Sequence, residues 1–79
     1  MDVTTAVRER ILTLCRERNI TVNKLGTISG ITQSTLKNIT SGRNGASVLT
    51  VKKICDGLEI GITEFFQDVM FQNLEQEIK

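Results

Sequence analysis

The stretch VNKLGTISGITQSTLKNI, residues 22–39, decides the fold. It predicts two short helices joined by a tight turn at Gly30, because a glycine adopts the positive φ of such a turn without steric strain. Leu25 on the first helix and Leu36 and Ile39 on the second lie at positions that face inward. Gly26 lies where the two helices must touch, and the absence of a side chain allows their close approach. We therefore expect a sharp two-helix corner whose second helix, residues 33–41, has a polar outer face.

Helices are also predicted on both sides of this corner. Apolar side chains recur at helical spacing over residues 4–18 and again after residue 47, and a fifth helix begins near Ile62. The expected inner faces are Val7, Ile11, Leu14 and Cys15 on the first helix and Val51, Ile54, Cys55 and Leu58 on the fourth. The residues that can end or cap these helices are, in chain order, Asn19, Thr21, Gly30, Thr32, Gly42 and either Ser47 or Thr50. The pattern is typical of an all-α domain of five helices.

Length and composition limit the class of protein. Seventy-nine residues suffice for one domain with one core, and 39% apolar with 24% charged residues is typical of a folded chain. The opening residues MDVTTAVRERIL reach charged side chains before any long apolar run, so we expect no signal peptide, no membrane span and a cytoplasmic protein. Cys15 and Cys55 lie forty residues apart in a chain without His, which fits neither a zinc site nor a redox CxxC pair. We expect no metal or other cofactor and two buried reduced thiols, with an inter-helix disulfide as the alternative.

Charge is distributed unevenly although the net charge is only +1. Residues 18–55 contain six basic and no acidic side chains, whereas residues 56–79 contain six acidic side chains and one Lys. A net charge near zero argues against a nucleic-acid partner, but the basic middle of the chain favours one. A solvated face with a chance asymmetry is the alternative explanation.

The segment 22–39 resembles the helix-turn-helix of the Cro and phage-repressor (XRE) family in the placing of its inward leucines, its glycines and its turn. The segment SVLTVKKICDGLEIGITEFF, residues 47–66, is similar to the fourth and fifth helices of that family. The resemblance covers about residues 5–67. It implies a five-helix lambda-repressor-like DNA-binding domain over residues 1–67 and a sequence-specific transcriptional regulator, expected to be a repressor of a double-stranded operator.

The resemblance also implies which residues meet DNA, because the third helix of this family enters the major groove. The side chains expected to meet base edges are Gln33, Ser34, Asn38 and, at the margin, Lys37. Gln and Asn suit this role because each amide donates and accepts at once, which matches the N7 and N6 groups of adenine. Phosphates would be held by backbone amides at the starts of helices two and three, assisted by Asn23, Thr32, Arg43 and Asn44. The alternative is that these polar side chains only solvate an exposed helix.

The last residues carry a second apolar pattern. Phe66, Met70, Leu74 and Ile78 recur every four residues, which predicts a helical tail over residues 68–79. The stripe would pack either on its own domain or against a second copy of the chain. A homodimer on a palindromic operator is expected independently, because one small domain reading a few bases rarely distinguishes its site from the genome.

Other function classes find less support in the sequence. The chain has no His, no Tyr and no phosphate-binding glycine loop, so no acid–base pair or activated nucleophile can be proposed. All three Phe residues lie in the acidic end, away from any basic groove for single-stranded nucleic acid. No small-molecule effector site is recognisable. The alternative from another class is a protein-interaction module, such as an antitoxin-like or anti-repressor protein on the same fold.

Overall fold

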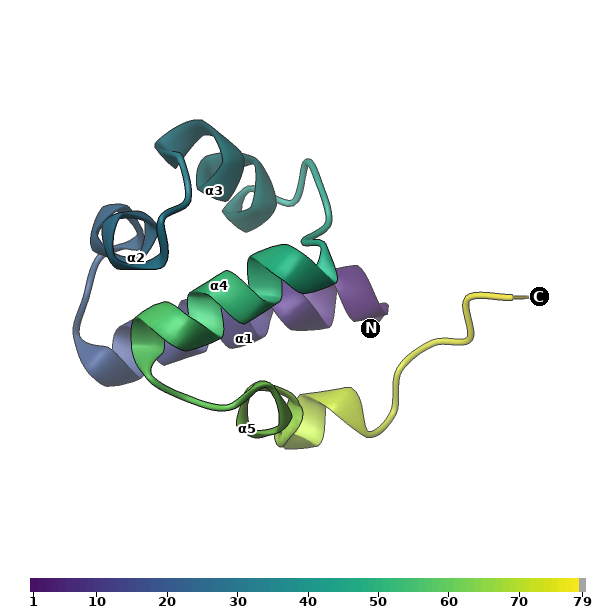
Figure 1. The fold of residues 1–79 in the computed structure, drawn as a ribbon. Helices are drawn as coiled ribbons and strands as arrows, with labels where there is room; N and C mark the ends of the chain where they lie inside the picture. Colours follow the sequence, from purple (N-terminus) through teal and green to yellow (C-terminus); the bar gives the residue numbers. More distant parts are fainter. Residues whose placement is uncertain (79) are drawn as a thin grey trace.

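Side-chain caps set the start of four of the five helices in the computed structural model, which describes residues 1–78 (Figure 1). The helices are α1 (Val3–Arg18), α2 (Val22–Ser29), α3 (Gln33–Thr40), α4 (Val48–Leu58) and α5 (Ile62–Phe66), followed by a 3₁₀ turn, η1 (Val69–Phe71). The caps are Asp2, Thr21, Thr32 and Ser47, each of which accepts a hydrogen bond from an amide in the first turn. No strand occurs in residues 1–78. The predicted all-α fold is confirmed.

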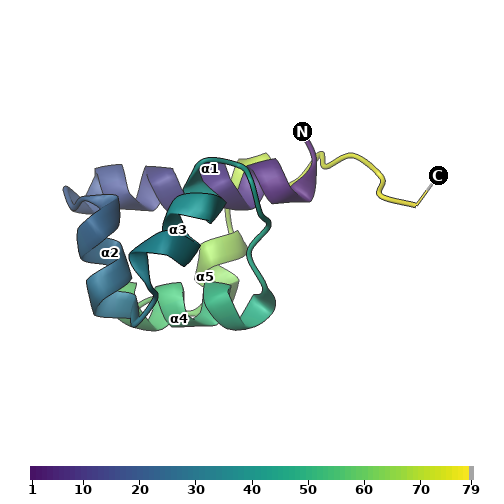
Figure 2. The same cartoon turned by 90° about the horizontal axis from the view of Figure 1, so that it is seen from above.

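Left-handed residues end three of the helices. Asn19 (φ 54°) ends α1 and Gly30 (φ 66°) ends α2, as the sequence predicts. Glu59 (φ 58°) ends α4 in the same conformation, which a residue with a side chain adopts only at some cost in strain. The left-handed Gly30 allows α3 to follow α2 around a tight corner, and α2 lies across one end of α1 and α4 (Figures 1 and 2).

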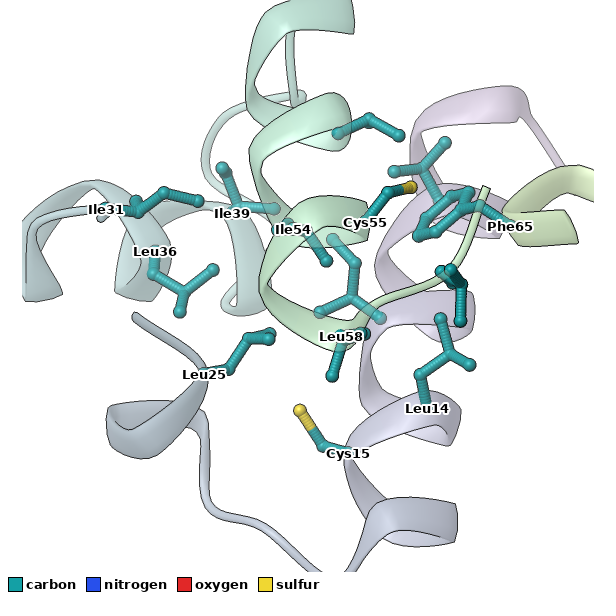
Figure 3. Packing of buried hydrophobic residues seen from close by; sticks show 14 residues of the cluster. Leu14, Cys15, Leu25, Ile31, Leu36, Ile39, Ile54, Cys55, Leu58 and Phe65 are labelled. Atoms are coloured by element: carbon teal, nitrogen blue, oxygen red, sulfur yellow. The ribbon is translucent and has the colours of Figure 1, made fainter. Parts of the chain in front are cut away.

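The core lies between α1, α4 and the α2–α3 corner (Figure 3). Ile11, Leu25, Leu36, Ile54 and Phe65 are fully buried. All eight residues predicted for the inner faces of the first and fourth helices are buried too. α2 packs more extensively on α4 than on any other element. Because this packing fixes α2 on α4, the α3 helix that follows α2 lies at the surface of the domain.

The two thiols lie in this core. Cys15 and Cys55 are free and buried, which confirms the expectation of reduced thiols. Burial raises the pKa of both thiols above the ordinary value, because a thiolate would lose its hydration there. Both therefore remain protonated at neutral pH and act as small apolar side chains.

The prediction of a helical tail over residues 68–79 is wrong for the described residues. α5 ends at Phe66, η1 adds one 3₁₀ turn, and residues 72–78 are irregular, while residue 79 lies outside the described residues. The expected stripe does not form: Phe66 and Ile78 are exposed, and Met70 and Leu74 are half-buried. Instead the segment turns back along the N-terminus, where the Glu75 amide donates to the Met1 carbonyl at 3.1 Å. Figure 1 shows the N-terminus and the last described residues of the tail on one side of the domain.

Arg10 of α1 binds the end of α5. Its Nε donates to the Phe65 carbonyl at 2.7 Å and its Nη2 to the Glu64 carbonyl at 3.0 Å. In a continuing α-helix these carbonyls would accept from amides four residues later. The Phe65 carbonyl therefore has Arg10 as its partner, whereas the Glu64 carbonyl also accepts from the Gln67 amide at 3.2 Å. Arg10 Nη1 also pairs with Asp68 at 3.4 Å. A four-residue apolar period in the sequence carries no sign of these long-range bonds.

No helix among residues 1–78 has the length and apolar character needed to cross a membrane.

Candidate nucleic-acid interface

The outer face of α3 is polar and uncovered. Gln33, Ser34 and Lys37 are exposed and Asn38 is half-buried, while Leu36 and Ile39 on the opposite face are buried. In the view from above, no other helix lies in front of α3 (Figure 2). The structure therefore places the four residues predicted to meet bases on one short helix, on the face that is directed away from the core.

Gln33 is tied to the neighbouring helix. Its Nε2 donates to the backbone carbonyl of Asn23 on α2 at 3.0 Å. The bond crosses the α2–α3 corner near Gly26, which is buried. The second Nε2 hydrogen and the Oε1 atom of Gln33 remain able to bind another partner.

The starts of α2 and α3 present backbone donors on the same part of the domain. The first amides of a helix have no partner inside it, so those of Val22 and Asn23 on α2 and of Gln33 and Ser34 on α3 are available to an anion. The Thr32 hydroxyl accepts from the Thr35 amide and donates to the Thr35 hydroxyl, so this side chain caps α3. Asn23 is exposed in the first turn of α2.

The loop after α3 is held at the end of that helix. The Asn38 carbonyl accepts from the amides of Arg43 and Asn44 at 2.9 and 3.0 Å. Gly42 has φ 84°, and the Arg8 guanidinium from α1 occupies the space that a side chain there would fill. The loop therefore carries the two predicted phosphate contacts beside α3, with a cation of α1 next to them.

Within residues 1–78, four basic side chains have no hydrogen-bond or ion-pair partner, and three of them lie on or next to α3 while Lys53 belongs to α4. Arg18 donates to the Leu58 carbonyl at 2.8 Å and Lys52 pairs with Asp56, which also raises the pKa of Lys52. No hydrogen bond or ion pair within residues 1–78 engages Lys24, Lys37 or Arg43 through its side chain. These three belong to the start of α2, the outer face of α3 and the loop after α3, and the chain from residue 18 to residue 55 has no acid to neutralise them.

Two basic residues were missed by the sequence reasoning. Arg8 and Arg10 both belong to α1, for which only the apolar inner face was predicted. A signal existed for Arg10, because it lies three residues after Val7 and four before Leu14 and so falls on the inner face. For Arg8 there was no signal, since its position beside the loop depends on how α1 meets α3.

Within residues 1–78 no group of His, Cys, Asp or Glu is arranged to hold a metal ion. What the site offers is an exposed helix with amide side chains, two helix N-termini and cations without acidic neighbours. A protruding helix with these groups defines a helix-turn-helix domain suited to duplex DNA.

Comparison with known proteins assigns the family. The model of the helix-turn-helix family matches residues 11–65, and the chain belongs to this family. It is a DNA-binding transcription regulator of the XRE type, and the family is one of regulatory domains and not of enzymes. No curated protein matches the sequence. Among solved structures, the crystal structure of the prophage Lp1 protein 11 is similar, with 28% identity and a TM-score of 0.81 over 94% of this chain and 100% of the other.

Proposed function

We propose that this protein binds a specific double-stranded operator by placing α3 in the major groove, and that it represses transcription there. The observation that carries the proposal is the outer face of α3, where Gln33, Ser34 and Asn38 are presented without a covering element. An α-helix fits the major groove, and each base pair presents a distinct pattern of donors and acceptors there. Occupancy of a promoter by such a domain excludes polymerase sterically, which is the simplest route to repression.

We assign the recognition of base edges to the amides of Gln33 and Asn38, with Ser34 and Lys37 beside them. Gln and Asn pair in bidentate fashion with adenine, whereas Lys37 reaches either a guanine or a phosphate. Asn38 is half-buried, so its amide is restricted by the surrounding side chains.

Phosphate binding falls to the rim of this face. Two sides of α3 carry groups that can bind phosphate. They are the first amides of α2 and α3, the side chains of Asn23 and Asn44, and the cations Lys24 and Arg43. We assign the Thr32 side chain a supporting part, because its hydroxyl caps α3 and so keeps the amides of Gln33 and Ser34 directed outward. The rim positions the helix, and the amides on α3 then read the sequence.

Selection of bound sites from a random duplex pool tests this proposal. We expect an enriched consensus with an inverted repeat, and specific binding about 10³-fold or more tighter than binding to random duplex at moderate salt. A pool without any enriched sequence would contradict sequence-specific reading. A protein-interaction module on the same fold would show no consensus and would leave a heparin column early as salt rises.

We further propose that the protein binds its operator as a symmetric homodimer. With two-fold symmetry, two α3 helices about 34 Å apart would meet half-sites centred about ten base pairs apart. The exposed apolar groups at the C-terminal end support this: Phe66 is 39% exposed and Val69 is 73% exposed. Both border an open hollow of about 260 Å³, and the Phe66 ring packs edge to face against the rings of Phe65 and Phe71. We propose that a second copy covers this surface, in place of the helical stripe that the sequence suggested.

Replacement of Val69 by Gln should weaken self-association by about tenfold or more, because a symmetric interface loses the apolar contact twice. Sedimentation equilibrium with and without operator measures this. Leu49→Gln is the matched control, since Leu49 is another exposed apolar residue, 64% exposed, at the start of α4. If Leu49→Gln disrupts the dimer and Val69→Gln does not, the interface lies at α4. One protomer binding with full affinity would refute the dimer altogether.

A further inference from the structure

Gly26 leaves a space that the side chain of Gln33 uses. A Cβ built on Gly26 would lie 2.9 Å from Gln33 Nε2, closer than real Cβ contacts allow, and 3.1 Å from the Ile31 carbonyl oxygen. The same Nε2 donates to the Asn23 carbonyl, which is one helical turn before Gly26 on α2. Gln33 can therefore lie against α2 only because residue 26 has no side chain.

The partner of Gln33 also fixes which way its amide faces. A backbone carbonyl accepts hydrogen bonds and donates none, so only the NH₂ end of the Gln33 amide can face Asn23. The Oε1 atom then lies on the other side of the amide. One Nε2 hydrogen is used and the second remains, so a base edge meets a donor and an acceptor in one fixed order.

We propose that Gly26 is a specificity-determining residue: it allows the Asn23 carbonyl to hold the Gln33 amide in the single orientation that suits an adenine edge. This inference rests on the proposed function, because it assumes that Gln33 reads a base. Adenine needs a donor to its N7 and an acceptor for its N6 amino group, which the free Nε2 hydrogen and Oε1 supply in that order. An unrestrained amide would offer both orders and would also lose more conformational freedom on binding.

Gly26→Ala is the test, because the new methyl group and the Gln33 Nε2 cannot occupy the same space. The flexible Gln33 side chain is the part that can move, while the Ile31 carbonyl must yield by a few tenths of an ångström. Ala is the better helix former, which offsets part of this strain, so we expect the variant to fold. The control is Gly61→Ala at the start of α5, where φ is −78° and the methyl group would meet only the Thr63 hydroxyl, at 3.8 Å.

Two readouts separate the inference from the function on which it rests. In the free wild-type protein, NMR should show nuclear Overhauser contacts between the Gln33 side-chain NH₂ and backbone protons of residues 23–26. These should vanish in Gly26→Ala and persist in Gly61→Ala. On DNA, discrimination at one position of each half-site should fall by about tenfold in Gly26→Ala and stay unchanged in Gly61→Ala. It should show no further loss when Gly26→Ala is added to Gln33→Ala.

Absence of the contacts in the wild-type protein, or their survival in Gly26→Ala, would overturn the role of Gly26 whatever the DNA measurements give. Loss of the contacts with unchanged base discrimination would overturn it as well. If the contacts behave as expected but the wild-type protein prefers no base at all, the proposed reading function fails, and the specificity role assigned to Gly26 fails with it.

Discussion

Replacing Arg10 by Met should lower the free energy of unfolding by about 2–4 kcal/mol, a large part of the stability of a domain of this size. Arg10 is buried, with 8% of its surface exposed, and its guanidinium supplies donors to the carbonyls of Glu64 and Phe65 and to Asp68. Met fills a similar volume without any donor, so the Phe65 carbonyl would lose its partner, while the Glu64 carbonyl would keep only the Gln67 amide. Urea unfolding followed by circular dichroism measures the loss.

Two further variants show which of these bonds matters. Arg10→Lys keeps the charge but presents a single ammonium in place of a planar fork, and should recover only part of the lost stability. Asp68→Asn should lower the free energy of unfolding by less than about 1 kcal/mol, because its contact is longer, at 3.4 Å, and its side chain is 25% exposed. Equal stability of Arg10→Met and the wild-type protein would mean that water satisfies the α5 carbonyls, and our account of the helix end would be wrong.

The second large effect is expected on DNA, and it separates residues that read bases from residues that hold phosphates. Gln33→Ala or Asn38→Ala should each remove about 1–3 kcal/mol of discrimination at one position of each half-site, where we expect an adenine. Arg43→Ala should instead weaken operator and random duplex about equally, because a cation in the loop reaches a phosphate and not a base edge. Its log–log salt slope should fall by about 0.9 per protomer.

Binding titrations on the operator, on single-base variants and on random duplex at several salt concentrations measure both effects. Ser41→Ala is a suitable control, since Ser41 is exposed at the end of α3 and its hydroxyl bonds only to the Asn38 carbonyl, at 3.3 Å. Thermal unfolding should change little in Gln33→Ala, whose side chain is exposed. Unchanged base preferences in both amide variants would show that α3 is not the reading element.

Local chemistry is what made the helices predictable. Caps act over three residues, as Thr21 and Thr32 do at Lys24 and Thr35, and a left-handed end such as Gly30 depends on the residue itself. The apolar residues at helical spacing form the core for the same reason, because helical geometry alone brings them to one face. The resemblance to the helix-turn-helix family added duplex DNA as the expected partner, and it rested on residues of α2 and α3.

The sequence by itself determined five helices, the caps at Thr21 and Thr32, the left-handed ends at Asn19 and Gly30, the buried faces and the polar outer face of α3, since all of these follow from interactions within a few residues. Tertiary structure alone decided the end of α5, the position of Arg8 beside Gly42 and the bond from Gln33 to Asn23. Arg10 and Phe65 are 55 residues apart in the chain, and Gln33 and Asn23 belong to different helices. Such bonds depend on how the helices pack, and a four-residue apolar period after Phe66 could not reveal that an arginine from α1 binds the last carbonyls of α5.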